Sequence, residues 1–147
     1  LGTGDAHYES ALRSLEYRRH DAVRSLIMFS SEMSSKVYAS CDAFLMPSKT
    51  EPCGLSQLIS MRYGTVPIVH RVGGLYDTVQ PFDGVHGTGF TFESFNSGDL
   101  LDAVRRTKEV YDFQKENWAS IVSQAMSKDV SWNQSAKQYV SLYQSIL

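Results

Sequence analysis

Residues 43–64 read Ala43-Phe-Leu-Met-Pro-Ser-Lys-Thr-Glu-Pro-Cys-Gly-Leu-Ser-Gln-Leu-Ile-Ser-Met-Arg-Tyr-Gly64. The apolar run from Ala43 to Met46 has the length of a buried parallel strand, and Pro47 has no N–H with which to continue a ladder. Apolar residues then recur at helical spacing, from a first turn that holds Pro52 to a C-terminal Gly64. A strand, a turn and a helix in this order predict an α/β fold.

The predicted helix would place the N–H groups of residues 53–56 at the carboxyl edge of the sheet. Open α/β sheets bind ligands at this edge, and N–H groups at a helix start attract anions. Glu51 at the mouth is unfavourable for a bare phosphate, but it favours a ligand that is anionic at one end and rich in hydroxyls at the other. The alternative, in which Glu51 only interacts with the helix dipole, stays open.

Composition limits the function classes. The chain has 147 residues, of which 42% are hydrophobic, and this is enough for the core of one globular domain. A net charge of −2 with scattered basic residues argues against nucleic-acid binding. No apolar run approaches the length of a membrane helix, and no signal peptide is visible. Two cysteines fit a reducing compartment. The four histidines lack metal-ligand spacing, so we expect no metal, and we expect His70 and His86 to be solvated or in loops.

The remaining sequence alternates between strand and helix patterns. In the first predicted helix, Tyr8, Leu12 and Leu15 would face a core. Pro67 is tolerable near the start of its strand. The predicted helices are residues 6–20, 32–40, 75–79, 99–111, 115–126 and 132–146, and the predicted strands are residues 25–29, 43–46, 66–70 and 89–92.

Two adjacent glycines, Gly73 and Gly74, follow the predicted strand at 66–70. They allow close approach of the backbone to a ligand, or a positive φ. A Gly-Gly pair is often only a turn. Its place between a strand and a helix favours a second ligand-binding loop beside Glu51.

Three blocks of sequence closely resemble bacterial glycogen synthase and plant starch synthase, which are retaining glycosyltransferases of the two-domain GT-B architecture. The blocks are Glu51-Pro-Cys-Gly-Leu-Ser-Gln-Leu, Arg62-Tyr-Gly-Thr-Val-Pro-Ile-Val and Val72-Gly-Gly-Leu-Tyr-Asp-Thr-Val. The resemblance implies a Rossmann-like open parallel sheet flanked by helices, as in the C-terminal half of a GT-B glycosyltransferase that lacks its first strand. Residues 1–147 would be a partial nucleotide-sugar-binding domain, with 115–147 as C-terminal helices.

The resemblance also implies an activity: transfer of glucose from ADP-glucose to the non-reducing end of an α-1,4-glucan with retention, in the cytoplasm, with neither a metal nor another cofactor. Phe29 would stack on the adenine, although a Phe at a strand end is often a core residue. We expect this chain alone to be inactive, because the family's basic pair and acceptor groove belong to segments that precede it. The implied catalytic residue is Glu51, and the implied donor-binding residues are Phe29, Cys53, Gly54, Leu55, Ser56, Gly73 and Gly74.

Without its first strand the sheet would have unpaired edges in its interior. We therefore expect direct pairing of the flanking strands, or a homo-oligomer formed through the exposed edges. We also expect the aromatic residues of the last helix to be exposed or self-associated.

Two other functions stay open. One is a sucrose or trehalose-phosphate type of GT-B transferase, although many of these have a second Glu where this chain has Ile59. The other is a non-catalytic nucleotide-binding or interaction module, which fold alone does not exclude.

Overall fold

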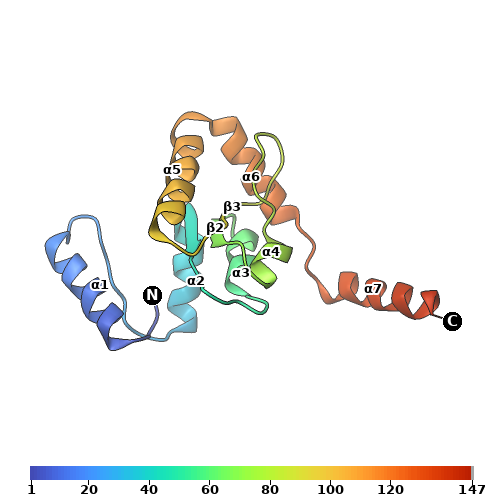
Figure 1. Cartoon of the computed structure of the whole chain (residues 1–147), viewed down its shortest axis with the longest axis horizontal. Helices are drawn as coiled ribbons and strands as arrows, with labels where there is room; N and C mark the ends of the chain where they lie inside the picture. The colour runs from blue at the N-terminus through green and yellow to red at the C-terminus, as the bar shows by residue number, and fades with distance from the viewer. Residues whose placement is uncertain (147) are drawn as a thin grey trace. The chain divides into compact units, whose positions relative to one another are not determined.

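The computed structural model describes residues 1–146, in which a first compact unit spans residues 1–40 and a second begins at Cys41 (Figure 1). The first unit contains helix α1 (Ala6–Arg18) and helix α2 (Ser31–Ser40). Each helix begins with a side-chain cap. Asp5 accepts a hydrogen bond from the His7 N–H at 2.8 Å, and Ser30 Oγ accepts one from the Met33 N–H at 3.1 Å.

The core face predicted for α1 is exposed. Tyr8, Leu12 and Leu15 all lie on the surface, and α1 has no buried residue. The first unit contains no strand among its residues, so α1 has no sheet within the unit on which to bury an apolar face. The helix prediction is confirmed, and the prediction of its burial is wrong.

The predicted strand at 25–29 does not form. In this segment the Leu26 carbonyl accepts hydrogen bonds from the N–H groups of Gly2 and Met28, each at 3.0 Å. The second of these turns the chain back on itself, which is incompatible with an extended ladder. A short apolar run becomes a strand only where a neighbouring strand satisfies its backbone, so the prediction is wrong.

The second unit contains a parallel sheet of three strands in the order β1-β2-β3: β1 (Ala43–Met46), β2 (Val66–His70) and β3 (Phe90–Phe92). Ala43 pairs with Val66, and Ile68 pairs with Phe90. Every residue of β2 and β3 is buried, whereas β1 is an edge strand whose Leu45 is 45% exposed. The bounds predicted for β1 and β2 are confirmed. The predicted burial of β1 is wrong, because none of its four residues is buried at the edge of the sheet.

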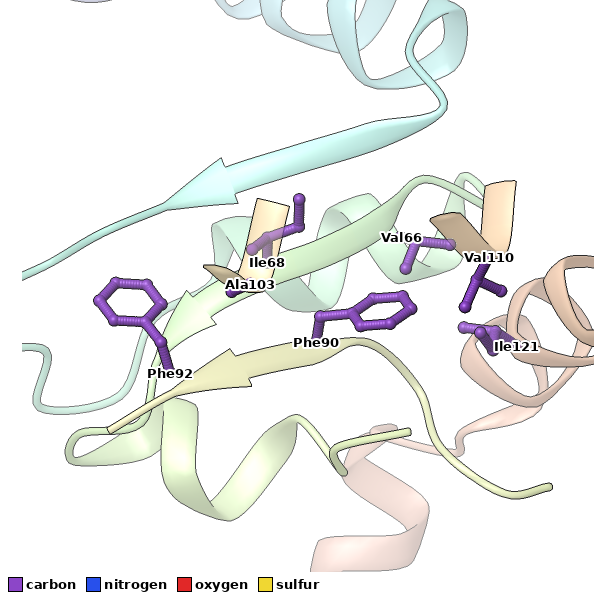
Figure 2. Close-up of a cluster of buried hydrophobic side chains, with 7 residues drawn as sticks. All are labelled: Val66, Ile68, Phe90, Phe92, Ala103, Val110 and Ile121. Carbon is purple, nitrogen blue, oxygen red and sulfur yellow. The ribbon is translucent and has the colours of Figure 1, made fainter. Parts of the chain in front are cut away.

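Helices α3 (Ser56–Arg62), α4 (Gly74–Thr78), α5 (Ser97–Phe113) and α6 (Lys115–Ser127) pack against this sheet. Alternate residues of β2 point to opposite faces. Val69 packs with Leu75 and Val79 on the face that carries α4. The main core lies on the other face, where β2, β3, α5 and α6 meet (Figure 2), and consists of Val66, Ile68, Phe90, Phe92, Ala103, Val110 and Ile121. The predicted α/β fold class with a parallel sheet is confirmed.

Helix α3 ends in a Schellman motif. The Gly64 N–H donates to the Met61 carbonyl at 3.0 Å, and the Thr65 N–H donates to the Ser60 carbonyl at 2.9 Å. Gly64 has a φ of +80°, which a residue with a side chain adopts at a cost. The predicted end of this helix is confirmed, and the motif directs the chain into β2.

The last helix, α7 (Trp132–Ser145), buries none of its residues. Ser131 caps it by accepting a hydrogen bond from the Gln134 N–H. Its Trp132 is 86% exposed, and Tyr139 and Tyr143 are exposed as well. The predicted exposure of the aromatic surface of this helix is confirmed. No helix among residues 1–146 is long and apolar enough to cross a membrane.

Candidate functional site

The loop between β1 and α3 carries Glu51, whose side chain is half-buried and is not part of the core. Ser48 Oγ donates a hydrogen bond to Glu51 Oε2 at 3.3 Å, which orients the carboxylate. Pro47 follows directly after β1, as its missing N–H predicts. The carboxylate therefore lies beyond the carboxyl end of a parallel strand, the edge where open α/β sheets bind ligands.

The glycine pair lies directly against this loop. The Gly74 N–H donates to the Glu51 carbonyl at 2.9 Å. A Cβ at Gly73 would lie 2.1 Å from the Glu51 carbonyl oxygen, and Gly73 also has a φ of +50°. A Cβ at Gly74 would lie 2.0 Å from the Cys53 carbonyl oxygen. Both glycines are needed because two backbones touch here, and the predicted proximity of the two loops is confirmed.

Helix α3 begins at Ser56, four residues later than Pro52, which the sequence placed in the first turn. Cys53, Gly54 and Leu55 therefore lie in the loop, and Leu55 is the N-cap without a side-chain cap bond. Gly54 has a φ of +73°, which is not helical and explains the late start. The predicted start of the helix is wrong, although residues 53–56 still connect the Glu51 loop to it.

A buried glutamine holds this loop. Gln57 is fully buried, and its Nε2 donates to the carbonyls of Cys53 and Gly54 at 3.1 and 2.9 Å, with Thr78 Oγ1 at 3.1 Å. Thr78 is the last residue of α4, so one side chain connects α3, the loop and α4. Sequence reasoning missed Gln57. The available signal was a polar residue three positions after a glycine in a helix whose other face is apolar.

His70 also contacts the Glu51 loop. Its ring is 7% exposed, with Nδ1 2.8 Å from the Ser48 carbonyl oxygen and Nε2 3.2 Å from the Glu93 carbonyl oxygen. The expectation of a solvated or loop histidine is wrong for His70, because it is the last residue of the central strand. His86 is exposed, as expected.

A fixed positive charge lies beside the glycine turn. The Arg71 guanidinium forms an ion pair with Glu93 at 3.0 Å and lies 4.3 Å from the centre of the Tyr76 ring. The hydrogen bond to Glu93 raises the pKa of Arg71 above its ordinary value. Arg71 therefore stays charged, and its charge is compensated inside the protein.

Two candidate residues have less defined surroundings. Cys53 is exposed, and its thiol contacts the Gly54 carbonyl oxygen at 3.6 Å. Phe29 belongs to the first unit, where it is 91% exposed. Its stacking role stays a prediction, whereas the alternative of a core Phe is wrong. Within residues 1–146 no group of three or more His, Cys, Asp and Glu side chains is arranged to hold a metal ion.

The family model for glycosyl transferases group 1 matches residues 1–120. The chain belongs to this family. It is 50% identical to the glycogen synthase of Lachnospira eligens, in an alignment that covers 99% of this chain and 31% of that protein. It is 48% identical to the glycogen synthase of Thermotoga petrophila, with 100% of this chain and 31% of that protein covered. The chain thus spans about a third of the length of these relatives.

A solved structure has the same fold. The catalytic domain of starch synthase IV from Arabidopsis thaliana, bound to ADP and acarbose, superimposes with a TM-score of 0.85 and 36% identity over 98% of this chain and 31% of that one. Sucrose-phosphate synthase from Thermosynechococcus elongatus matches with a TM-score of 0.66 and 24% identity over 98% of this chain and 37% of that one, which shows a shared fold alone. The resemblance to glycogen and starch synthases is confirmed.

Proposed function

We propose that this chain supplies the donor-binding part of a glucosyltransferase that moves glucose from ADP-glucose to the non-reducing end of an α-1,4-glucan with retention. Glycosyl transfer is the chemistry of its family. The relatives named as glycogen synthases support the glucan acceptor. The starch synthase IV structure, which holds ADP, supports an adenine nucleotide in the donor.

The observation that carries this proposal is the hydrogen bond from the Gly74 N–H to the Glu51 carbonyl, at 2.9 Å. It holds the loop that carries the half-buried Glu51 carboxylate against the glycine turn, at one edge of a parallel sheet. A nucleotide sugar offers one chemical group to each part, because its hexose hydroxyls donate to a carboxylate and its diphosphate requires N–H groups and close approach of the backbone.

Each candidate residue has a role in this proposal. Glu51 accepts hydrogen bonds from two glucose hydroxyls. Gly73 offers an exposed backbone to the diphosphate, and Gly74 lets the turn pack against the Glu51 loop. N–H groups at the start of α3 stabilise the charge that builds on the leaving diphosphate. The remaining candidates line the donor: Phe29 at the adenine, Cys53, Gly54 and Leu55 along the wall, and Ser56 as a hydroxyl to phosphate.

The remaining parts of the proposal concern the whole protein. Residues 1–147 form part of its nucleotide-sugar-binding domain, with 115–147 as the C-terminal helices, and the protein acts in the cytoplasm. The exposed edge strand β1 and the aromatic face of α7 offer surfaces for a homo-oligomer. We expect the 147-residue chain to bind the donor without transferring glucose.

The test is a titration of the chain with ADP-glucose and UDP-glucose. Glu51→Ala should weaken ADP-glucose binding about tenfold or more, the cost of a charged hydrogen-bond acceptor, while ADP binds nearly as before. Glu109→Ala, which removes an exposed carboxylate from α5, is the matched control.

Equal affinity of Glu51→Ala and wild type for ADP-glucose contradicts the role of Glu51. A preference for UDP-glucose in the longer protein that contains this chain favours a sucrose or trehalose-phosphate type of transferase. The absence of nucleotide binding in that protein favours a non-catalytic interaction module.

A further inference from the structure

We propose that His70 is a positioning residue, which holds the Glu51 loop in its sugar-binding conformation by donating a hydrogen bond from Nδ1 to the Ser48 carbonyl. This inference rests on the proposed function for its consequence in binding. The bond itself is a property of the free protein and is open to direct measurement.

The distances to two carbonyl partners favour a hydrogen on Nδ1 of the ring. Nδ1 lies 2.8 Å from the Ser48 carbonyl oxygen, and a carbonyl oxygen only accepts. A hydrogen bond between these two atoms therefore requires a hydrogen on Nδ1. Nε2 faces a second carbonyl, that of Glu93, at the longer distance of 3.2 Å. A neutral ring with its single N–H at Nδ1 satisfies the shorter bond, and a ring protonated on both nitrogens satisfies both.

Aromatic neighbours fix the plane of the ring. Phe92 lies nearly parallel to it, at 5.3 Å between centroids and 28° between planes. Phe95 lies at 5.4 Å and 52°. A ring held in this way at the end of β2 aims Nδ1 in one direction, toward the loop after β1.

The end of β2 and the turn after it therefore hold the Glu51 loop at two points. The first is His70 on Ser48, and the second is the Gly74 N–H on the Glu51 carbonyl. Ser48 continues the connection, because its hydroxyl donates to the Glu51 carboxylate at 3.3 Å. Without the His70 bond the loop remains attached through the Glu51 carbonyl, but the Ser48 backbone is no longer held in place. The Ser48 hydroxyl then no longer has a fixed position from which to donate to Glu51. The orientation of the carboxylate should suffer more than the fold.

Two amide substitutions separate this role from general packing. Asn places its side-chain N–H₂ near the position of Nδ1, and Gln places it near the position of Nε2. His70→Asn should therefore keep the bond to the Ser48 carbonyl. His70→Gln should lose this bond and donate only to the Glu93 carbonyl. His70→Phe preserves an aromatic ring and removes both donors. Phe113→Leu is the matched control, because it removes an exposed ring at the end of α5 and leaves His70 and the two rings beside it unchanged.

Chemical-shift titrations of the 147-residue chain with ADP-glucose and with ADP provide the binding readout. We expect His70→Asn and Phe113→Leu to bind ADP-glucose within about twofold of wild type. We expect His70→Gln and His70→Phe to lose about three- to tenfold, the size of one hydrogen bond. ADP, which has no glucose, should bind all five proteins alike. Equal losses in the Asn and Gln variants, or an equal loss for ADP, overturn the proposal.

A second measurement does not depend on any ligand or on the stability of a variant. The ¹⁵N spectrum of the His70 ring in the wild-type chain should show a protonated Nδ1. An unprotonated Nδ1 overturns the proposal. If wild type binds neither nucleotide, the proposed function fails, and this spectrum alone decides whether His70 holds the loop.

Discussion

The contact between the glycine turn and the Glu51 loop predicts how Gly74→Ala changes the free energy of unfolding. Helix propensity and packing predict changes of opposite sign. Gly74 is the first residue of α4, and helix propensity alone predicts that Gly74→Ala stabilises the protein by about 0.5–1 kcal/mol. Packing predicts the reverse. The new Cβ would lie 2.0 Å from the Cys53 carbonyl oxygen and 2.4 Å from the Cys53 Cα, so one of the two backbones must move.

The magnitude follows from three contributions. Overpacking of a well-packed contact costs about 1–3 kcal/mol. Displacement of the loop also weakens the 2.9 Å hydrogen bond from Gly74 to Glu51, at a cost of about 1 kcal/mol. Subtracting the gain in propensity leaves a net loss of about 1–3 kcal/mol. For a chain of this size, each 1 kcal/mol lowers Tm by about 4 °C, so the expected decrease is about 4–12 °C.

Thermal unfolding followed by circular dichroism measures this decrease. Gly98→Ala is the matched control, because Gly98 also lies in the first turn of a helix, α5, and its Cβ would meet only the Asn96 side-chain oxygen at 3.1 Å. The control should unfold within about 2 °C of wild type or above it. If Gly74→Ala is as stable as this control, the close approach of the two loops is not a feature of the folded protein.

Two further perturbations test other parts of the structure. Hydrogen bonds from the His86 and Val85 N–H groups lower the pKa of Asp83, so its contribution to stability is present above its ordinary pKa of 3.8 and is lost as the pH falls through the native value. Tm of Asp83→Asn, measured between pH 2 and pH 7, should therefore fall less steeply on the acid side of about pH 4 than Tm of wild type, and identical slopes contradict this. Removal of residues 131–147 deletes a helix with no buried residue, so Tm should change by less than about 3 °C. Binding of a hydrophobic dye should decrease. A larger decrease in Tm would mean that α7 packs on the rest of the protein.

Local patterns predicted the second unit well because its local and long-range preferences agree. The run at 43–46 is a strand, and Gly64 ends α3, since a positive φ and a Schellman motif need only residues within one turn. Asn96 caps α5 by accepting a hydrogen bond from the Asp99 N–H at 2.9 Å. These features depend on neighbours in the sequence, and the sequence displays them.

The failures depend on partners that the sequence does not display. The run at 25–29 resembles β1 in composition, yet it has no ladder and forms no strand. The face of α1 with Tyr8 and Leu12 has an amphipathic spacing, yet nothing in its unit covers it. Periodicity predicts which residues share a face of a helix or strand, but it does not predict what packs against that face. The presence of a helix is therefore predicted better than the burial of its residues.

The residues of the candidate site also differ in whether the sequence alone indicates them. Glu51, Gly73 and Gly74 stand out in the sequence because each lies between a predicted strand and a predicted helix, where open α/β sheets bind ligands. Gln57 and His70 do not stand out, because each has a partner far away in the sequence. Gln57 reaches Thr78 across 21 residues, and His70 reaches Ser48 across 22.

The backbone contacts and the side chains of the site should respond differently to substitution. The main-chain bond and the backbone contacts at the glycine pair fix where the loop lies, whereas side chains such as His70 fix only how the loop's groups point. A substitution at a glycine moves the loop and should reduce both stability and binding, because no rotamer relieves an overlap with a carbonyl oxygen. A substitution at His70 that preserves its donor should change neither. Measurements of binding free energy and unfolding free energy should therefore separate the two classes of variant. Variants at Gly73 and Gly74 should lose both, whereas variants of His70 that lose the donor to Ser48 should lose binding free energy alone.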